Sequence, residues 1–386
     1  PVREGHIAEV GGLDRIEREN SGVEVRHFPR CTILPGAVNT HAHLGFRRKD
    51  APEGGTFSGW LSRLIERLPE KESWTAEAAR DSAREAIEAG TTFMAEPSPY
   101  GECLPQLAES GMAGILFAEF FPHDIGTPEE AADFILNRVS ELRDGLPVRV
   151  DAQVSVHSPY TVDPKSARLA ARGTRERGDR LAIHLSESPA EVEFVRHGTG
   201  GLTDIFGQND WGGVGVSPVR YAQDVELLGP RTIAAHLATG ISGEDIEILA
   251  ATDTTAAHCP RSNAFLGCDV SPVPQMMQRG IRVGMGTDGL WSSPSMNLFE
   301  ETLFAVELHG FDGATGLRLA TLDGARVLGI EDETGSLEAG KWADLAVVET
   351  APENGDLERE VLEAAAGGDV AATVVGGELI YNRVGA

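Results

Sequence analysis

The sequence predicts a (β/α)8 barrel accompanied by a small composite β-sandwich that the two ends of the chain build together. Short apolar runs alternate with amphipathic helical patterns through most of the 386 residues, as in parallel sheets made of βα units. Eight βα units close most economically as a barrel, whose functional loops follow the carboxyl ends of the strands. The expected strands are Thr32–Val38, Thr91–Ala95, Gly114–Phe120, Val148–Val156, Arg180–His184, Thr232–His236, Thr254–His258 and Ile281–Gly286.

Capping residues mark the starts of the intervening helices, because a side-chain oxygen before the first turn can accept a bond from a free amide. The expected pairs of cap and helix are Ser73 with Thr75–Ala89, Thr127 with Pro128–Arg143, Asp163 with Pro164–Arg177, and Ser242 with Glu244–Ala251.

The segment Thr199–Ser217 is rich in glycine, contains Trp211 and lacks periodicity. It is expected to be a long loop or a subunit contact, which makes a homodimer a reasonable expectation.

The two flanks do not follow the βα alternation. Residues 1–34 and 335–386 contain short β-type runs separated by glycine and aspartate turns, and are expected to form the β-sandwich beside a catalytic barrel of residues 35–334. The expected runs are His6–Val10, Val23–Phe28, Leu345–Val348, Ala371–Val375 and Leu379–Asn382.

Composition excludes several classes of partner. The formal charge of −27 and pI near 4.7 disfavour nucleic acid and anionic membranes, whose phosphates would be repelled. The acidic residues are spread along the chain, which is typical of a solvated surface. No apolar run approaches the length of a membrane span, and the first residues do not resemble a signal peptide. The four cysteines form no CxxC pair, so reduced thiols and a cytoplasmic location are expected.

Polar residues follow the predicted strands at their carboxyl ends. His41 and His43 stand one residue apart, and side chains at i and i+2 share one face of a strand. A single histidine at such a position is as often structural as functional, but a whole series indicates a shared centre. The series is His41, His43, His157, His184 with Glu187, His236, His258 and Asp288. Three imidazoles and one carboxylate suit zinc or iron, with a further position open for water.

These motifs resemble the amidohydrolase superfamily, and within it the branch of nucleoside and nucleobase deaminases. The resemblance rests on Pro35-Gly-X-X-Asn-X-His-X-His43, His184-X-X-Glu187, His236, His258-Cys-Pro-Arg-Ser-Asn263 and Gly286-Thr-Asp288, and on the segment from Gly335 to Leu345. It covers nearly the whole chain.

The resemblance implies an enzyme that hydrolyses C–N bonds other than peptide bonds. It places one divalent transition metal, zinc or alternatively iron, on His41, His43, His184 and Asp288. His236 would contact the metal-bound water, Asp288 would accept its proton, and Glu187 would shuttle protons without binding the metal. The chemistry agrees, because a divalent ion makes bound water a nucleophile near neutral pH and a carboxyl group can protonate the adjacent ring nitrogen.

The end of the fourth strand favours a single metal. Many members with two metals have a carboxylated lysine there, whereas this chain has His157, and Lys165 already belongs to the next helix. His157 is expected either to face the substrate or to be a buried, hydrogen-bonded histidine.

The segments around His157, Ser188–Phe194 and Ser217–Tyr221 are similar to enzymes that deaminate 6-aminodeoxyfutalosine, an adenine nucleoside of menaquinone biosynthesis. Phe57 and Trp60 could stack on an aromatic ring or pack against the next helix. Glu96 could accept bonds from ribose hydroxyls or play a capping or solvated role.

Three alternatives stay open at the level of sequence. The first is deamination of S-adenosylhomocysteine, another adenosine derivative or a nucleobase. The second is hydrolysis of another leaving group, such as chloride from a triazine or the bond of a cyclic amide. The third, a catalytically inactive scaffold, is disfavoured by the intact set of ligand and acid residues.

Overall fold

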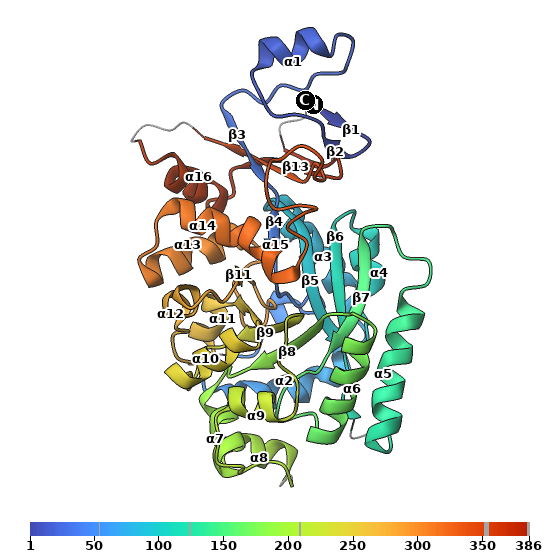
Figure 1. Ribbon diagram of the computed structural model, residues 1–386, viewed down its shortest axis with the longest axis vertical. Coiled ribbons are helices and arrows are strands. Elements are labelled where there is room, and N and C mark those ends of the chain that lie inside the picture. Colours follow the sequence, from blue (N-terminus) through green and yellow to red (C-terminus); the bar gives the residue numbers. More distant parts are fainter. Residues whose placement is uncertain (54, 123–124, 208–209, 351–354, 384–386) are drawn as a thin grey trace.

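A closed parallel barrel forms the body of the molecule in the computed structural model (Figure 1), which describes the chain except for residues 54, 123–124, 208–209, 351–354 and 384–386. Its strands pair in chain order from β4 to β11. The amide and hydroxyl of Thr40 donate to the carbonyl of Met285 at 2.9 and 2.8 Å, which joins the first strand to the last. The strands are β4 (Ala37–Asn39), β5 (Thr91–Pro99), β6 (Ala113–Glu119), β7 (Val150–Ser155), β8 (Leu181–Leu185), β9 (Thr232–His236), β10 (Thr255–His258) and β11 (Val283–Met285).

Helices cover the outside of the barrel (Figure 1). They are α2 (Phe57–Lys71), α3 (Thr75–Glu88), α4 (Leu104–Glu109), α5 (Pro128–Leu142), α6 (Pro164–Glu176), α7 (Pro189–His197), α8 (Gly201–Phe206), α9 (Pro218–Asp224), α10 (Gly243–Ala251), α11 (Pro260–Phe265), α12 (Val273–Gln278), α13 (Leu298–His309), α14 (Gly313–Ala320) and α15 (Leu322–Leu328), with a short 3₁₀ turn η1 (Arg48–Asp50). Thr127, Asp163 and Ser242 cap their helices as expected. The prediction for Ser73 is wrong, because Trp74 is the N-cap of α3 and the Ser73 hydroxyl instead donates to Glu70 O.

A composite β domain lies at the amino ends of the barrel strands (Figure 1). The N-terminal strand β3 pairs with β12, which continues to β13 and β14 in one antiparallel sheet, and β1 pairs with β2 in a separate hairpin. Its elements are β1 (Val2–Arg3), β2 (His6–Ile7), α1 (Leu13–Glu19), β3 (Cys31–Pro35), β12 (Leu345–Glu349), α16 (Leu357–Ala366), β13 (Val370–Val375) and β14 (Glu378–Asn382). The exact division of the chain into domains stays a prediction.

Three segments differ from expectation. The run Thr32–Val38 splits into β3 of the β domain and β4 of the barrel. The chain crosses between the two sheets at Gly36, where a Cβ atom would overlap the side chain of Thr92. Val23–Phe28 forms no strand and is largely exposed, so its side chains bury too little apolar area to hold a sheet position. The segment Thr199–Ser217 contains the helix α8, and Trp211 Nε1 donates to Pro159 O at 3.0 Å, so this connection packs on the barrel.

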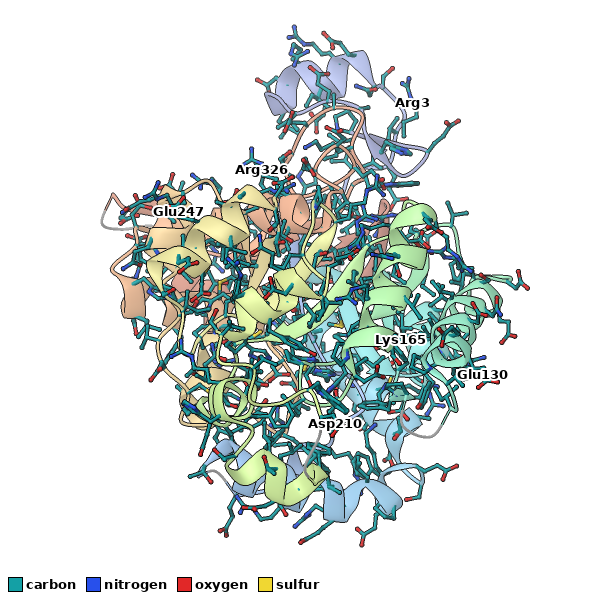
Figure 2. All side chains as sticks on the ribbon, turned by 60° about the horizontal axis from the view of Figure 1, so that its bottom comes forward. Arg3, Glu130, Lys165, Asp210, Glu247 and Arg326 are labelled. Carbon is teal, nitrogen blue, oxygen red and sulfur yellow. The ribbon has the colours of Figure 1, made fainter. Side chains whose placement is uncertain are left out.

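The interior of the barrel is packed with side chains, which confines the functional groups to one end. Phe93 and Ala95 of β5 join Ile115 and Phe117 of β6 in a buried inner cluster, and side chains alternate between the inside and the outside along each strand. Charged side chains such as Glu130 and Lys165 lie over the outer helices (Figure 2). All four cysteines are free thiols. In the described part of the chain, no helix combines the length and hydropathy of a membrane span.

Candidate active site

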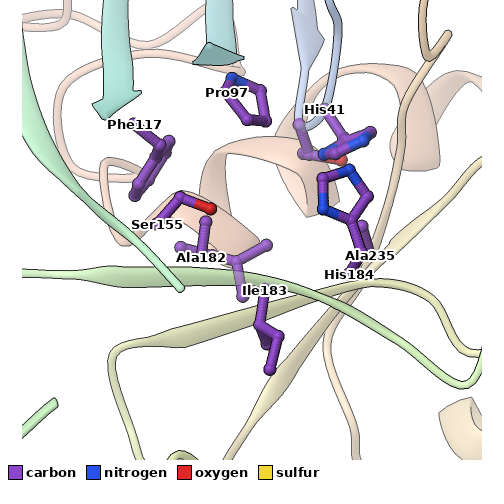
Figure 3. A pocket seen from close by; sticks show the side chains of 10 residues that line it. His41, Pro97, Phe117, Ser155, Ala182, Ile183, His184 and Ala235 are labelled. Atoms are coloured by element: carbon purple, nitrogen blue, oxygen red, sulfur yellow. The ribbon is translucent and has the colours of Figure 1, made fainter. Parts of the chain in front are cut away.

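Three histidines and one aspartate converge at the carboxyl ends of the barrel strands. Each of His41, His43 and His184 offers a nitrogen, and these nitrogens all lie within 4.8 Å of one another. Asp288 Oδ1 lies 3.8 Å from His41 Nε2 and 3.6 Å from His43 Nε2. Figure 3 shows His41 and His184 together beside a cavity of about 10 Å³ inside the barrel, which is room for about one water molecule. The structure therefore brings together four side chains that the sequence predicts as metal ligands.

Backbone carbonyls orient two of these rings. His43 Nδ1 lies 2.7 Å from Pro97 O, and His184 Nδ1 lies 3.0 Å from His157 O. Because a carbonyl only accepts, each Nδ1 carries the hydrogen and each Nε2 presents its lone pair to the cluster. His41 Nε2 is buried and has no hydrogen-bond partner among the described residues. Burying a polar nitrogen without a partner destabilises the fold, unless a ligand binds to it.

Asp288 is held by two serine hydroxyls. Ser262 and Ser292 donate to its Oδ2 at 2.5 and 2.7 Å, which leaves Oδ1 facing the histidines. Burial disfavours the charge of Asp288, but the neighbouring histidines outweigh it, and the pKa of this carboxyl lies well below its usual range. Neither serine is predicted from the sequence to contact Asp288. Ser262 lies in α11 and Ser292 in the loop after β11, and only the packing of these two segments brings both hydroxyls to the carboxylate.

A second pair of groups, His236 and Glu187, lies beside the cluster. His236 Nδ1 donates to Asn263 Oδ1 at 2.9 Å, so its Nε2 faces the site. That nitrogen lies 3.7 Å from Glu187 Oε1. Burial raises the pKa of Glu187 well above its ordinary value, and the charge of Asp288 adds to the effect. A carboxyl group that burial keeps protonated, close to an imidazole, is suited to moving protons.

His157 lies next to the cluster and is half-buried. Its Nδ1 contacts the hydroxyls of Ser158 and Thr161, and its ring is 4.9 Å from that of His184. Glu119, which the sequence analysis did not single out, lies 3.6 Å from His184 Nδ1 and forms a second group of metal-type side chains with His157 and His184. Because His184 Nδ1 already bonds to the carbonyl of His157, its free Nε2 is directed toward His41 and His43.

Two predicted substrate contacts are packed residues of α2. Phe57 and Trp60 are both buried. Trp60 Nε1 donates to Trp291 O at 3.2 Å, which ties the loop after the first strand to the loop after the last. The ring of Phe57 is 6.3 Å from that of Tyr160, which in turn neighbours His157.

Two strand-end residues point away from the cluster. Ala95 belongs to the inner cluster and Pro97 lines the central cavity, so Glu96 between them faces outward. Glu96 is fully buried, accepts a bond from Leu44 N at 3.3 Å, and has its pKa raised to about 7 by burial. This position does not support the predicted contact with ribose hydroxyls. His258 also lies outside the metal-type cluster, because its Nε2 is 3.1 Å from His309 Nε2 on α13.

Comparison with known proteins agrees with this geometry. The model of the amidohydrolase family matches residues 32–380. The chain belongs to the amidohydrolase family. A 5-methylthioadenosine/S-adenosylhomocysteine deaminase of Symbiobacterium thermophilum is 31% identical to it, in an alignment that covers 90% of this chain and 81% of the relative. A 5'-deoxyadenosine deaminase of Methanopyrus kandleri is 29% identical, in an alignment that covers 98% of this chain and 88% of the relative. The chain is thus a hydrolytic deaminase of this family.

Solved structures share the fold. An aminofutalosine deaminase of Helicobacter pylori in complex with methylthio-coformycin matches with a TM-score of 0.87 and 22% identity, covering 98% of this chain and 94% of that one. An adenosine deaminase of Xanthomonas campestris with bound zinc matches with a TM-score of 0.82 and 22% identity, covering 98% and 87%. These likenesses confirm the (β/α)8 barrel with its accompanying β domain.

Proposed function

We propose that the enzyme hydrolyses the exocyclic amino group of adenine-type nucleosides and releases ammonia. The observation that carries this proposal is the convergence of four metal-type side chains with the pair His236 and Glu187 in a member of the deaminase branch. The names of the two curated relatives described above, which are deaminases of adenine nucleosides, support the substrate class.

The donor set fits one divalent transition metal. His41, His43 and His184 would supply three nitrogens and Asp288 one oxygen, a combination that suits zinc or iron. The buried Nε2 of His41, which has no protein partner in the described chain, is the observation that such a ligand would explain. When bound, the ion supplies Lewis acidity and activates water at neutral pH.

The protein groups would then move the protons. His236 Nδ1 bonds to Asn263, which turns Nε2 toward the site, where it can contact the attacking water. Glu187 is protonated through burial and can donate to the ring nitrogen next to the amino group, which makes the ring carbon more electrophilic. The attacking water gives up two protons in all. Asp288 can accept one of them, and the ionised Glu187 can take up the other and pass it to the departing amine as the carbon–nitrogen bond breaks. The proton on Asp288 then restores Glu187, so that water and an adenine nucleoside yield the corresponding hypoxanthine nucleoside and ammonia.

The substituent at the 5′ position is the finer part of the proposal. The curated relatives favour 5′-methylthioadenosine, S-adenosylhomocysteine and 5′-deoxyadenosine as substrates of this enzyme. The sequence motifs favour 6-aminodeoxyfutalosine and hence a step of menaquinone biosynthesis. His157 lies beside the cluster, where it can contact the substrate.

A substrate panel tests the proposal. Purified enzyme is given each of these four nucleosides, adenosine, and the bare bases adenine, guanine and cytosine, and ammonia release is followed. We expect the highest kcat/KM for a nucleoside with a 5′ substituent, and the best of the four identifies the group. A preference for a bare base would contradict the nucleoside assignment, and chloride release from a chlorotriazine without deamination would replace it with the alternative leaving group.

A further inference from the structure

The turn after β8 carries Glu187 in a conformation that requires support. Ser186, the residue before it, has a φ angle of +52°. This is a left-handed backbone conformation that residues other than glycine rarely adopt. A catalytic side chain on such a turn is well placed only if neighbouring groups hold the backbone.

A single buried carboxylate bonds to both amides of this turn. Ser186 N donates to Glu191 Oε1 at 2.8 Å, and Glu187 N donates to Glu191 Oε2 at 2.9 Å. Glu191 lies in the first turn of α7, where Ser188 Oγ accepts from its amide at 3.2 Å, and it is fully buried. Both carboxylate oxygens are therefore used by the turn itself.

The other side of the turn is held from the loop after β9. Thr239 Oγ1 donates to Glu187 O at 2.9 Å, and the amides of Ala238 and Thr239 donate to Ser186 O at 2.9 and 2.7 Å. The peptide groups around Glu187 are thus fixed from two directions. Its side chain is left to face His236.

We propose that Glu191 is a positioning residue, which aims the Glu187 carboxyl group at the substrate by binding the two amides of the turn. The inference rests on the proposed role of Glu187 in proton transfer. Glu191 itself does not contact the reacting atoms in this proposal, because both of its oxygens are occupied by backbone amides.

Glu191→Gln tests the proposal, with Glu193→Gln on the exposed side of the same helix as the control. Glutamine offers one acceptor and one donor, so one of the two amides loses its acceptor and meets an N–H group. We expect kcat to fall about 10- to 100-fold, as for a small misplacement of a catalytic group, with KM within about threefold and bound metal unchanged. The control should match the wild type.

A double variant separates positioning from a general structural effect. If Glu191 acts through Glu187, adding Glu191→Gln to Glu187→Gln should lower kcat by less than about threefold further. The same fractional loss in both backgrounds, or loss of metal from Glu191→Gln, would overturn the proposal.

Hydrogen exchange provides a readout that does not depend on the proposed function. The amides of Ser186 and Glu187 should exchange faster in Glu191→Gln than in the wild type and in Glu193→Gln. If the wild type releases ammonia from no nucleoside, the proposed function fails, and this exchange measurement still decides whether Glu191 holds the turn. Unchanged exchange would overturn that role.

Discussion

Asp344, at one end of the barrel, and the candidate site, at the other, differ in how completely their buried polar atoms are hydrogen-bonded. At the end that carries the β domain, the fully buried Asp344 accepts two bonds from Arg149, at 2.7 and 2.6 Å. Thr334 and Gly376 N also donate to it, at 2.8 and 2.9 Å. At the opposite end, buried nitrogens and oxygens of the candidate site lack hydrogen-bond partners within the described chain. They are His41 Nε2, His236 Nε2 and Glu119 Oε1.

This difference separates structural from functional polar groups. A buried polar atom without a partner costs about 1–3 kcal/mol, whereas a paired and hydrogen-bonded charge holds its neighbours in place. Arg149 directly precedes the barrel strand β7, and Asp344 directly precedes β12 of the β domain. The bond between them therefore joins the barrel to the β domain and stabilises the fold. The candidate-site atoms without hydrogen-bond partners lower the stability of the folded protein. A bound metal ion and substrate can offset this loss by binding to them.

The largest effect is expected from His184→Ala. Removal of one of four converging donors should release the metal and lower kcat/KM by more than about 10³-fold, since the nucleophile depends on the ion. Elemental analysis and ammonia release measure the two losses in one sample. Near-normal turnover by a variant that has lost its metal would contradict the site assignment.

The opposite pattern is expected from Asp344→Asn. This change keeps the shape of the side chain but leaves the part-buried guanidinium of Arg149 without its counter-ion, so the free energy of unfolding should fall by about 3 kcal/mol. The kcat of the folded fraction should stay within about twofold. Urea denaturation together with activity at saturating substrate measures both quantities.

The exposed pair Arg172–Glu226 provides the control for that experiment. Its guanidinium and carboxylate lie 2.6 Å apart at the surface, and Arg172→Ala should cost less than about 1 kcal/mol because water screens the pair. An equal loss in both variants would show that burial does not set the contribution of Asp344.

Glu187→Gln should separate proton transfer from metal binding. We expect metal content to stay unchanged while kcat falls by about 10²-fold or more, the range of general acid–base catalysis. Metal loss in this variant would show instead that Glu187 is a ligand.

The smallest effect concerns pH. Burial raises the pKa of Glu96 to about 7 in the folded protein, so the folded state binds more protons than the unfolded state between about pH 4.5 and 7. Its contribution to stability is therefore greatest below that range and is lost as the pH rises through it. The metal-free variant Glu96→Gln should become more stable relative to the wild type by about 1–3 kcal/mol between pH 4.5 and 8, measured by urea denaturation. The exposed Glu193→Gln should keep the pH dependence of the wild type.

The barrel and the polar residues at its strand ends could be predicted from the sequence, because both depend on local sequence patterns. The strand Thr232–His236 was predicted with its observed bounds, and His41 and His43 share a side because alternate residues of an extended segment point the same way. The rule that the carboxyl ends of barrel strands meet at one end predicts that His184 and Asp288 lie on the same rim. The choice of these two as ligands, out of the whole series of strand-end residues, came from the resemblance to the amidohydrolase superfamily.

Other features of the site depend on tertiary packing, which no local sequence pattern fixes. Glu96 and Pro97 both follow the apolar part of β5, and only the register of the closed barrel decides that Pro97 faces inward. His258 pairs with His309, which is 51 residues away in the chain. The serines that hold Asp288 come from the helix α11 and from the loop after β11, so their role depends on how these two segments pack together.

The most direct test of the proposed single metal site is a metal titration of the enzyme, followed by its activity on its best nucleoside substrate. Chelated protein should release no ammonia above the uncatalysed rate. Activity should rise with added zinc or iron and reach its maximum at about one ion per chain, since the four converging groups form one site. Full activity without metal, or a maximum that requires two ions per chain, would contradict the proposal of one catalytic metal site.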